Sequence, residues 1–368
     1  MHLIVTTCGT SLLTNLASND AGLRKLAIAH ANAESPDHLP TEARERLEAL
    51  LARAERELAD ADREMQRRLS AEMNGLHLLR QEPPKQAQGM HWLVASDTWL
   101  GRGTAACVAR ALESVGEKAE IKPIRGLRTD ALDAFRTGVT ELARLCAQDI
   151  KGMRAGGRRV VFNLTGGFKA VQGFMQALGM LYADDIVYVF ERTDTLLHIP
   201  RLPVELDALQ IVRKHQYVFR RLEAGLPVTP EQVAGMPEML YERADDIIDL
   251  SVWGEALWHE AKYALLEEKL WPPVSDKLRF GDGFEKSVES ACKHQPDRLR
   301  IVNERLLQLA RHLEENDYNP QRLDFKKLKR KHGRWTHECD AWSDRDAKRL
   351  YGHFEDSVFV LDELGRHL

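Results

Sequence analysis

The sequence predicts an α/β protein with two folded parts: an N-terminal domain built on a parallel sheet, and a small C-terminal α+β domain with an antiparallel sheet. The first is predicted by strand-like and helix-like segments that alternate from residue 2 to about residue 205, with strands that are apolar on both faces. The second is predicted by the region after residue 276, where two helical segments precede four strand-like runs with no helix between them. Residues 206–275 are expected to form a helical connector.

The N-terminal domain is expected to span residues 1–205. Its predicted strands are residues 2–7, 90–97, 118–124, 158–163 and 185–191. Amphipathic helices are predicted between them, at residues 103–115, 129–146 and 168–182. Because parallel strands need crossover connections of this kind, the order predicts a sheet that is covered on both sides. Residues 195–206 are expected to add a short strand that closes the domain.

A helical insertion, residues 41–79, interrupts this alternation. The segment is nearly free of Gly and Pro, and apolar residues such as Leu47, Leu51 and Leu58 recur at steps of three and four. This spacing predicts one long amphipathic helix. Two interpretations stay open, because the helix either packs on its own domain or forms an arm that binds a second copy or a partner.

The C-terminal domain is expected to span residues 276–368, after a boundary at the Pro-containing stretch WPPVSD. It begins with a short strand, LRFG. Helices are predicted at residues 284–295 and 297–314, and strand-like runs at residues 323–330, 334–339, 347–354 and 357–364. Two helices followed by a meander of strands predict a small α+β domain with an antiparallel sheet.

Composition excludes several classes of protein. The 368 residues are 43% hydrophobic and 29% charged, which is typical of a folded soluble chain. The net charge of −4 gives no overall signature of nucleic-acid binding, so a DNA partner is not expected and a polyanion would need a local patch. The five Cys are scattered without a CxxC pair, which argues against a zinc site and suits a reducing cytoplasm. Neither a signal peptide nor a membrane span is predicted.

Two predicted strand ends carry turns that suit an anion. The predicted site consists of Gly9, Thr10, Ser11, Asn163, Thr165, Gly166, Gly167 and Lys169. Open parallel sheets bind ligands at the carboxyl ends of their strands, glycine lets the backbone approach a phosphate, and hydroxyl and N–H groups donate to it. The patterns G-x-x-x-x-G-K-[ST] and G-x-G-x-x-G are absent, which argues against a P-loop and a dinucleotide site. The alternative is that these glycines only form turns.

Four stretches of this domain resemble a known family of sensors. They are TTCGTSLLTN (residues 6–15), SAEMNGL (70–76), LVASDT (93–98) and NLTGGFK (163–169). The resemblance is to CARF domains, the Rossmann-like sensors of type III CRISPR accessory proteins, which bind cyclic oligoadenylates. It implies a homodimer in which a two-fold symmetric ring lies across both sheets and contacts the eight residues of the predicted anion site. Cyclic tetra-adenylate is the leading candidate for the activator, and no metal or other cofactor is implied.

The C-terminal domain contains the densest run of basic residues. Between Arg322 and Arg349 there are ten Lys and Arg against five Asp and Glu, so this stretch is positive although the chain is not. Aromatic side chains lie among the charges, as on a surface that stacks unpaired bases. They are Trp335, His337, Trp342 and Tyr351. The alternative is a solvated charged face.

The same domain resembles the RelE/ParE toxin superfamily over residues 277–368. The resemblance lies in the order of elements, the KLK…G-x-W turn, the RLY strand and the terminal RHL. It implies a metal-independent endoribonuclease that cuts mRNA on the ribosome through attack of a 2′-OH on the adjacent phosphate. By this resemblance Arg349 clamps the phosphate and His367 donates a proton, while Lys329, Lys331 and Arg334 hold the mRNA backbone. The general base stays open between His337 and Glu338.

Two other functions stay open. CARF domains often precede a HEPN ribonuclease, whose R-x4–6-H motif matches Arg305 with His312 on a predicted helix and Arg330 with His337 on a strand-like run. The second alternative is a regulatory or messenger-degrading protein whose C-terminal domain is not catalytic. The leading expectation is a cytoplasmic, homodimeric effector of type III CRISPR antiviral defence that cuts mRNA when it binds its ring.

Overall fold

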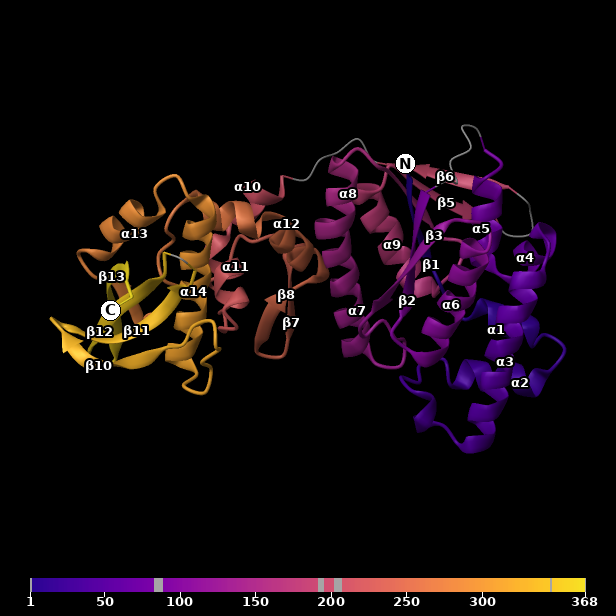
Figure 1. The fold of residues 1–368 in the computed structure, drawn as a ribbon, viewed down its shortest axis with the longest axis horizontal. Coiled ribbons are helices and arrows are strands. Elements are labelled where there is room, and N and C mark those ends of the chain that lie inside the picture. The colour runs from indigo at the N-terminus through magenta and orange to yellow at the C-terminus, as the bar shows by residue number, and fades with distance from the viewer. Residues whose placement is uncertain (1, 83–88, 191–194, 202–206, 345, 368) are drawn as a thin grey trace. The chain divides into compact units, whose positions relative to one another are not determined.

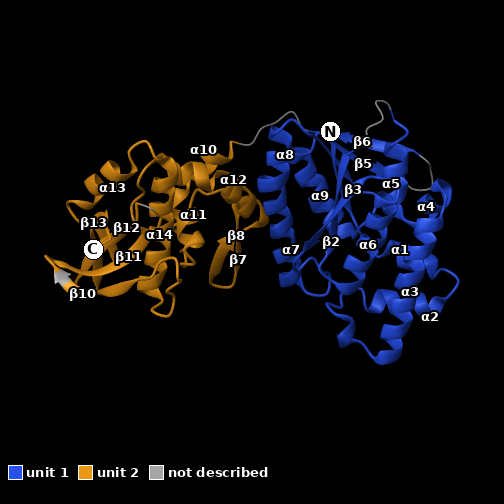
Figure 2. Cartoon of the chain, viewed as in Figure 1, with its two compact units in different colours: residues 1–206 blue, residues 207–368 orange. Residues whose placement is uncertain are grey.

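The computed structural model describes residues 2–82, 89–190, 195–201, 207–344 and 346–367. The chain folds as two compact units, residues 1–206 and 207–368, which are coloured separately in Figure 2. The predicted α/β class is confirmed, since one unit contains a sheet of mainly parallel strands and the other a separate, mainly antiparallel sheet. Residues 202–206 of the predicted closing segment lie outside the described residues.

The sheet of unit 1 has the strand order β3-β2-β1-β4-β5-β6. Its strands are β1 (His2–Thr7), β2 (Gly89–Ser96), β3 (Lys118–Ile124), β4 (Arg159–Asn163), β5 (Asp185–Val189) and β6 (Leu196–Pro200). All neighbours are parallel except β5 and β6. The central strand β1 is buried along nearly its whole length, as its apolar sequence predicts.

Helices cover both faces of this sheet. On one side lie α7 (Leu132–Leu145), α8 (Lys151–Ala155) and α9 (Lys169–Tyr182), with a π-helical turn, η2 (Cys146–Ile150), between the first two. On the other side lie α6 (Trp99–Glu113) and the helices of the N-terminal 79 residues (Figure 1). Thr98 caps α6 by accepting a hydrogen bond from the Gly101 amide at 3.2 Å.

The segment from residue 41 to residue 79 forms three helices, not the single long helix predicted. They are α3 (Thr41–Asp60), α4 (Arg63–Leu69) and α5 (Ala71–Leu79), which follow α1 (Ser11–Leu16), α2 (Ala21–Ala29) and the short η1 (Pro36–His38). The breaks fall at Asp62 and Ser70, whose side chains accept hydrogen bonds from the amides of Met65 and Met73. Such caps start new helices, and the periodicity of apolar residues does not reveal them. Leu47 and Leu58 of α3 are buried in the core of unit 1.

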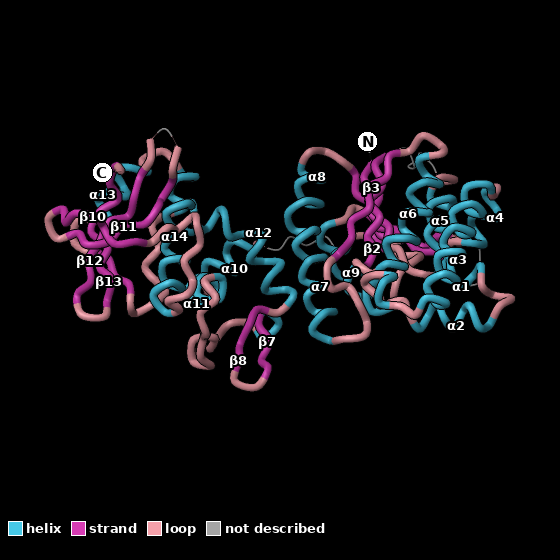
Figure 3. The backbone as a smooth tube through the Cα atoms, turned by 60° about the horizontal axis from the view of Figure 1, so that its bottom comes forward, coloured by secondary structure: helices cyan, strands magenta, loops and turns pink. Residues whose placement is uncertain are grey.

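Unit 2 begins with helices and a hairpin. The helices are α10 (Ala208–Lys214), α11 (Gln216–Glu223), η3 (Glu238–Leu240) and α12 (Val252–Glu268). The expectation of a wholly helical connector is wrong, because β7 (Tyr241–Ala244) and β8 (Ile247–Leu250) form an antiparallel hairpin that projects from these helices (Figure 3). Asp245 turns this hairpin with a φ of 53°, a conformation that Asp tolerates better than most residues. The described part of 207–275 belongs to the same unit as the C-terminal sheet. The two parts are joined by a hydrogen bond that the Trp271 amide donates to the side chain of Asn303 in the C-terminal region.

The second sheet has the strand order β10-β11-β12-β13-β9. Its elements are β9 (Leu278–Phe280), α13 (Phe284–Cys292), α14 (Pro296–Glu314), β10 (Lys326–His332), β11 (Trp335–Trp342), β12 (Lys348–Glu355) and β13 (Val358–Arg366). One face packs on α13 and α14 around Val288, Leu306, Leu350 and Phe359. None of the helices in the described ranges is long and apolar enough to cross a bilayer.

Candidate functional site

The two turns predicted to bind an anion lie side by side in unit 1. Strand β1 has β2 on one side and β4 on the other, so the chain leaves β1 and β4 at a topological switch point of the sheet. A Cβ atom on Gly9 would lie 3.1 Å from the Cα of Gly167, which shows how closely the turns approach. The Thr7 hydroxyl donates a 2.5 Å hydrogen bond to the Gly166 carbonyl, although the two residues are 159 positions apart. Both turns therefore lie together at one edge of the sheet.

Asn163 and Thr165 hold this edge together from the inside. Oδ1 of the Asn163 side chain accepts a 2.8 Å hydrogen bond from the Thr165 hydroxyl, and Nδ2 of the same side chain donates to the Glu72 backbone carbonyl at 3.1 Å. The Thr165 hydroxyl in turn accepts from the Val189 amide at 3.2 Å. Because these polar atoms are already paired, Asn163 and Thr165 shape the turn and are less available to a ligand than the sequence predicts.

Glu72 is a buried residue of this site that sequence reasoning did not assign. Its carboxylate, fully buried on α5, accepts hydrogen bonds from the Gly9 amide at 3.0 Å and the Ser70 hydroxyl at 2.8 Å. Burial raises the pKa of this carboxyl group. The Gly9 amide, expected to face a phosphate, therefore already donates to a carboxyl oxygen of the chain itself. The sequence signals at this place were the stretch SAEMNGL, which contains Glu72, and Gly75, the single glycine of the segment 41–79.

The part of the site open to solvent is formed by Thr10, Gly167 and Lys169, whereas the hydroxyl oxygen of Ser11 is buried. Thr10 and Gly167 are half-buried, and Lys169 is exposed at the first residue of α9. Phe168 occupies the N-cap of this 14-residue helix, and among the described residues no side chain caps its first-turn amides. Free amides, a positive helix end and an ammonium group together favour an anion at this place.

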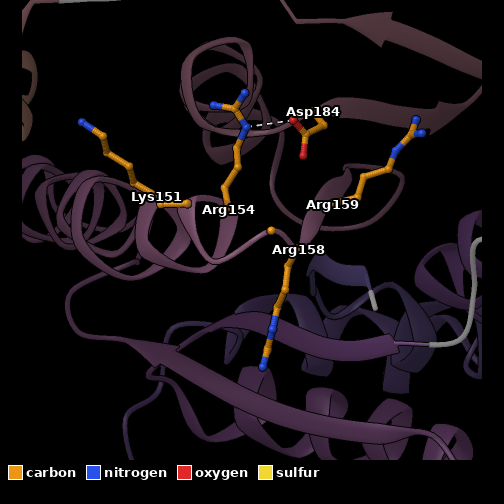
Figure 4. A pocket seen from close by; sticks show the side chains of 7 residues that line it. Lys151, Arg154, Arg158, Arg159 and Asp184 are labelled. Carbon is orange, nitrogen blue, oxygen red and sulfur yellow. Dashed lines mark hydrogen bonds and ion pairs between the residues drawn. The ribbon is translucent and has the colours of Figure 1, made fainter.

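A basic depression of about 790 Å³ lies at the opposite end of the same sheet, where β4 and β5 begin (Figure 4). Its charged residues are Lys151, Arg154, Arg158, Arg159 and Asp184. Arg154 points to Asp184 and is bonded to it at 2.8 Å, whereas Lys151 and Arg158 point apart. Lys151 and Arg154 lie near the C-terminal end of the continuous helical run 132–155, where cations stabilise a helix. Stabilisation of the helix end is therefore a sufficient structural reason for Lys151 and Arg154 to lie there.

In unit 2 the strand register separates a face covered by helices from an open, outer face. Leu350 and Leu364 are paired across β12 and β13 and point into the core. Arg349, the residue before Leu350 on β12, pairs with Asp340 of β11 on one side and with Gly365 of β13 on the other. Because side chains alternate along strands, Arg349 lies on the outer face.

Arg349 is surrounded by carboxylates. Its guanidinium forms an ion pair with Asp340 and lies 3.7 Å from a Glu338 oxygen and 3.8 Å from an Asp324 oxygen. Its side chain is only 13% exposed. A phosphate would have to displace at least part of this arrangement before Arg349 could bind it.

The other predicted catalytic residues are distributed over both faces. His367 is exposed one residue after β13 ends, and it follows by two positions Gly365, the cross-strand partner of Arg349. His337 instead stacks on Phe325 at 5.3 Å and meets the edge of the core residue Phe359. Burial lowers the pKa of His337, with a smaller contribution from Lys327. The structure therefore places Glu338 beside Arg349 and keeps His337 away from it.

The predicted RNA-binding residues are only partly open. Lys329 is exposed on β10, and Arg334 forms a 2.7 Å ion pair with Asp362. The side chain of Lys331 lies outside the described residues. Trp335 stacks on Tyr351 with ring centres 4.7 Å apart, whereas Trp342 is buried in the core. The predicted aromatic surface thus reduces to Trp335 over Tyr351.

The residues of the HEPN alternative make local contacts. On α14, Arg305 donates to Gln308 at 2.9 Å, and the His312 ring lies 2.7 Å from the Tyr318 carbonyl. Arg330 and His337 lie on neighbouring strands instead of one helix. Among the described residues, no cluster of three or more His, Cys, Asp or Glu is arranged to hold a metal ion.

Comparison with known proteins adds one finding. Residues 67–202 match a family described as CRISPR-associated protein (Cas_APE2256). The match supports a CRISPR-associated protein and a CRISPR-related role. It includes Glu72 and the turn from Asn163 to Lys169, whereas the turn after β1 and all of unit 2 lie outside it. No curated protein matches the chain.

Proposed function

We propose that the protein is a homodimeric sensor and effector of type III CRISPR defence, in which unit 1 is a CARF domain and unit 2 a RelE-like ribonuclease domain. A cyclic oligoadenylate binds at the switch point of unit 1, and unit 2 then cuts mRNA on the ribosome. The observation that carries the proposal is the contact between the turns of Gly9 and Gly167, with Lys169 beside them at an uncapped helix end.

The sheet of unit 2 supports the second half of the proposal. Its order, a short strand, two helices and four antiparallel strands, is the order expected for a RelE-like domain. In the proposed reaction a 2′-oxygen attacks the adjacent phosphorus, Arg349 stabilises the pentavalent phosphate, and His367 donates a proton to the leaving 5′-oxygen. Arg349 reaches the phosphate only after it exchanges a carboxylate partner, so the described arrangement corresponds to a resting state.

Calorimetry with cyclic tetra-adenylate, cyclic hexa-adenylate and a linear oligoadenylate tests the sensor. We expect saturable binding of a ring, and Lys169→Ala should weaken it about 10- to 100-fold because a charge-assisted contact to phosphate is lost. Lys118→Ala is the matched control, since Lys118 is an exposed lysine at the opposite end of the sheet, where β3 begins. Absence of binding by every ring would refute the proposed sensor.

Incubation with translating ribosomes tests the effector. We expect mRNA to be cut only when protein, ring and ribosomes are all present. Messages that stay intact under these conditions, with free RNA cut equally well without ribosomes, would refute the RelE assignment.

The carboxylates around Arg349 favour a second candidate, a regulatory or messenger-degrading protein whose unit 2 only binds a partner. In that case the ring itself is consumed or retained while mRNA stays intact. Following labelled cyclic oligoadenylate and mRNA in the same reaction distinguishes the two functions.

A further inference from the structure

We propose that His353 is the general base of the ribonuclease in unit 2 and that Asp362 is the residue that positions it. This inference rests on the proposed function, whose chemistry needs a group that accepts the 2′-OH proton. Of the two residues that the sequence offered, His337 lies on the helix-covered face, and Glu338 lies beside the guanidinium of Arg349.

His353 and Asp362 form a hydrogen-bonded pair on the outer face of the sheet. The Nδ1 atom of His353 lies 2.7 Å from a carboxylate oxygen of Asp362, whose side chain is only 2% exposed. A carboxylate at this position favours the tautomer with the proton on Nδ1. Nε2 lies 3.1 Å from the half-exposed carboxylate of Glu355, so its lone pair becomes available to a 2′-OH when that carboxylate turns away into solvent.

A bulge in β13 provides the position of Asp362. Tyr351 pairs with Glu363 and the next residue, Gly352, pairs with Leu361, so Asp362 is an extra residue on this strand. Bulges redirect side chains and are common beside active sites. Arg334 lies 2.7 Å from the second carboxylate oxygen of Asp362. The carboxylate of Asp362 thus has a cation on one oxygen and the imidazole on the other, an arrangement that can orient the ring.

His353 lies on the same face of β12 as Arg349. The two residues are four positions apart, and with about 3.3 Å per residue their Cα atoms are about 13 Å apart. Tyr351 lies between them on the same face, with Trp335 stacked on its ring. A nucleotide whose base stacks near Trp335 would place its ribose and phosphate between the imidazole and the guanidinium.

The proposed step balances without a cofactor. Nε2 of His353 takes the proton from the 2′-OH, the 2′-oxygen forms a bond to the adjacent phosphorus, and the bond from phosphorus to the 5′-oxygen breaks. The leaving 5′-oxygen takes a proton from His367. The products are a 2′,3′-cyclic phosphate and a 5′-hydroxyl, and His353 is left as an imidazolium that returns its proton to water.

A purely structural network of Arg334, Asp362 and His353 would predict different behaviour. As a base, His353 must be deprotonated, so the cleavage rate should rise with pH as the imidazole loses its proton. A structural network would change stability when it is broken, but it would leave the pH profile of the remaining activity unchanged.

The experiment measures single-turnover cleavage of ribosome-bound mRNA by the full chain with saturating ring, between pH 5.5 and 8.5. We expect His353→Gln to lower the rate about 100-fold or more and to remove the rising limb. Asp362→Asn should lower it about 10-fold or more. Added imidazole should restore part of the activity of His353→Ala. Thermal unfolding of each variant checks that unit 2 is folded.

His198→Gln is the matched control. His198 of unit 1 also lies between two carboxylates, 2.6 Å from Asp185 and 2.7 Å from Glu82, and this variant should cleave like the wild type. If the wild type cleaves and folded His353→Gln keeps its rate and pH profile, or if imidazole does not rescue His353→Ala, the role of His353 is overturned. If the wild type itself does not cleave, the proposed function fails instead.

Discussion

Replacing Gly75 by Ala should distort the candidate ligand site, because Gly75 packs against the turn that follows β4. Gly75 is the fifth residue of α5, and a Cβ atom there would lie 2.2 Å from Oδ1 of the Asn163 side chain and 2.5 Å from the Thr165 hydroxyl. Both distances are about 1 Å or more too short for a van der Waals contact. Helix α5 or the end of β4 must therefore move, and the hydrogen bond from Asn163 to the Glu72 carbonyl is strained or lost.

The expected cost follows from these contacts. Overpacking costs about 1–3 kcal/mol, and the lost hydrogen bond adds about 1 kcal/mol. Gly173→Ala is the matched control, because Gly173 is the fifth residue of α9 and a Cβ atom there would meet no described atom within 4 Å beyond the backbone of its own helix. Both changes gain about 1 kcal/mol of helix propensity. Gly75→Ala should thus be less stable than Gly173→Ala by about 2–4 kcal/mol.

Urea unfolding, combined with amide exchange of β1 and β4, measures this difference in unit 1 of the full chain. Faster exchange at the ends of both strands is expected in Gly75→Ala alone. Equal stability of the two variants, with unchanged exchange, would refute the contact of α5 with the switch point.

Two further predictions concern the same unit. Because burial raises the folded pKa of Glu72 above its unfolded value of about 4.3, its stabilising contribution is complete below that value and is lost as pH rises through the folded pKa. Urea unfolding between pH 4 and 8 should therefore show the wild type losing stability relative to Glu72→Gln, and parallel curves would contradict this. Leu47→Ala should destabilise unit 1 by about 2–5 kcal/mol and the half-buried Leu51→Ala by less, whereas equal effects in thermal unfolding would contradict the burial of α3.

The turns after β1 and β4 could be predicted from sequence because their signals are local. In each case an apolar run ends in glycine and hydroxyl residues before a helix, and the rule for parallel sheets brings such ends together. The β7–β8 hairpin escaped prediction because its strands have only four residues each and carry charges such as Glu242 and Arg243 between apolar positions. Short strands of this kind do not produce a clear alternation.

Glu72 escaped assignment for a different reason. Its contact with the Gly9 amide joins residues 63 positions apart, and it exists only because Asp62 and Ser70 break the insertion into helices that bend back over the sheet. Similarly, the pair of His353 and Asp362 depends on a bulge that shifts the register of β13 by one residue. A pattern of two-residue alternation cannot locate such a shift, since the shift itself changes which residues share a face.

The carboxylates around Arg349 would decide how unit 2 acts on a polyanion in the proposed function. A guanidinium that is 13% exposed has already lost most of its water, and Asp340, Glu338 and Asp324 replace that water with negative charge. In the proposed function RNA brings a phosphate to the same place, so binding would exchange one anionic partner for another and would not require a bare cation to be desolvated. The exchange leaves a displaced carboxylate next to the incoming phosphate, and this repulsion opposes RNA until a carboxylate moves away or a cation such as Lys329 offsets it. Under the proposed function, an outer face arranged in this way holds Arg349 ready for a phosphate and still disfavours RNA in the resting state.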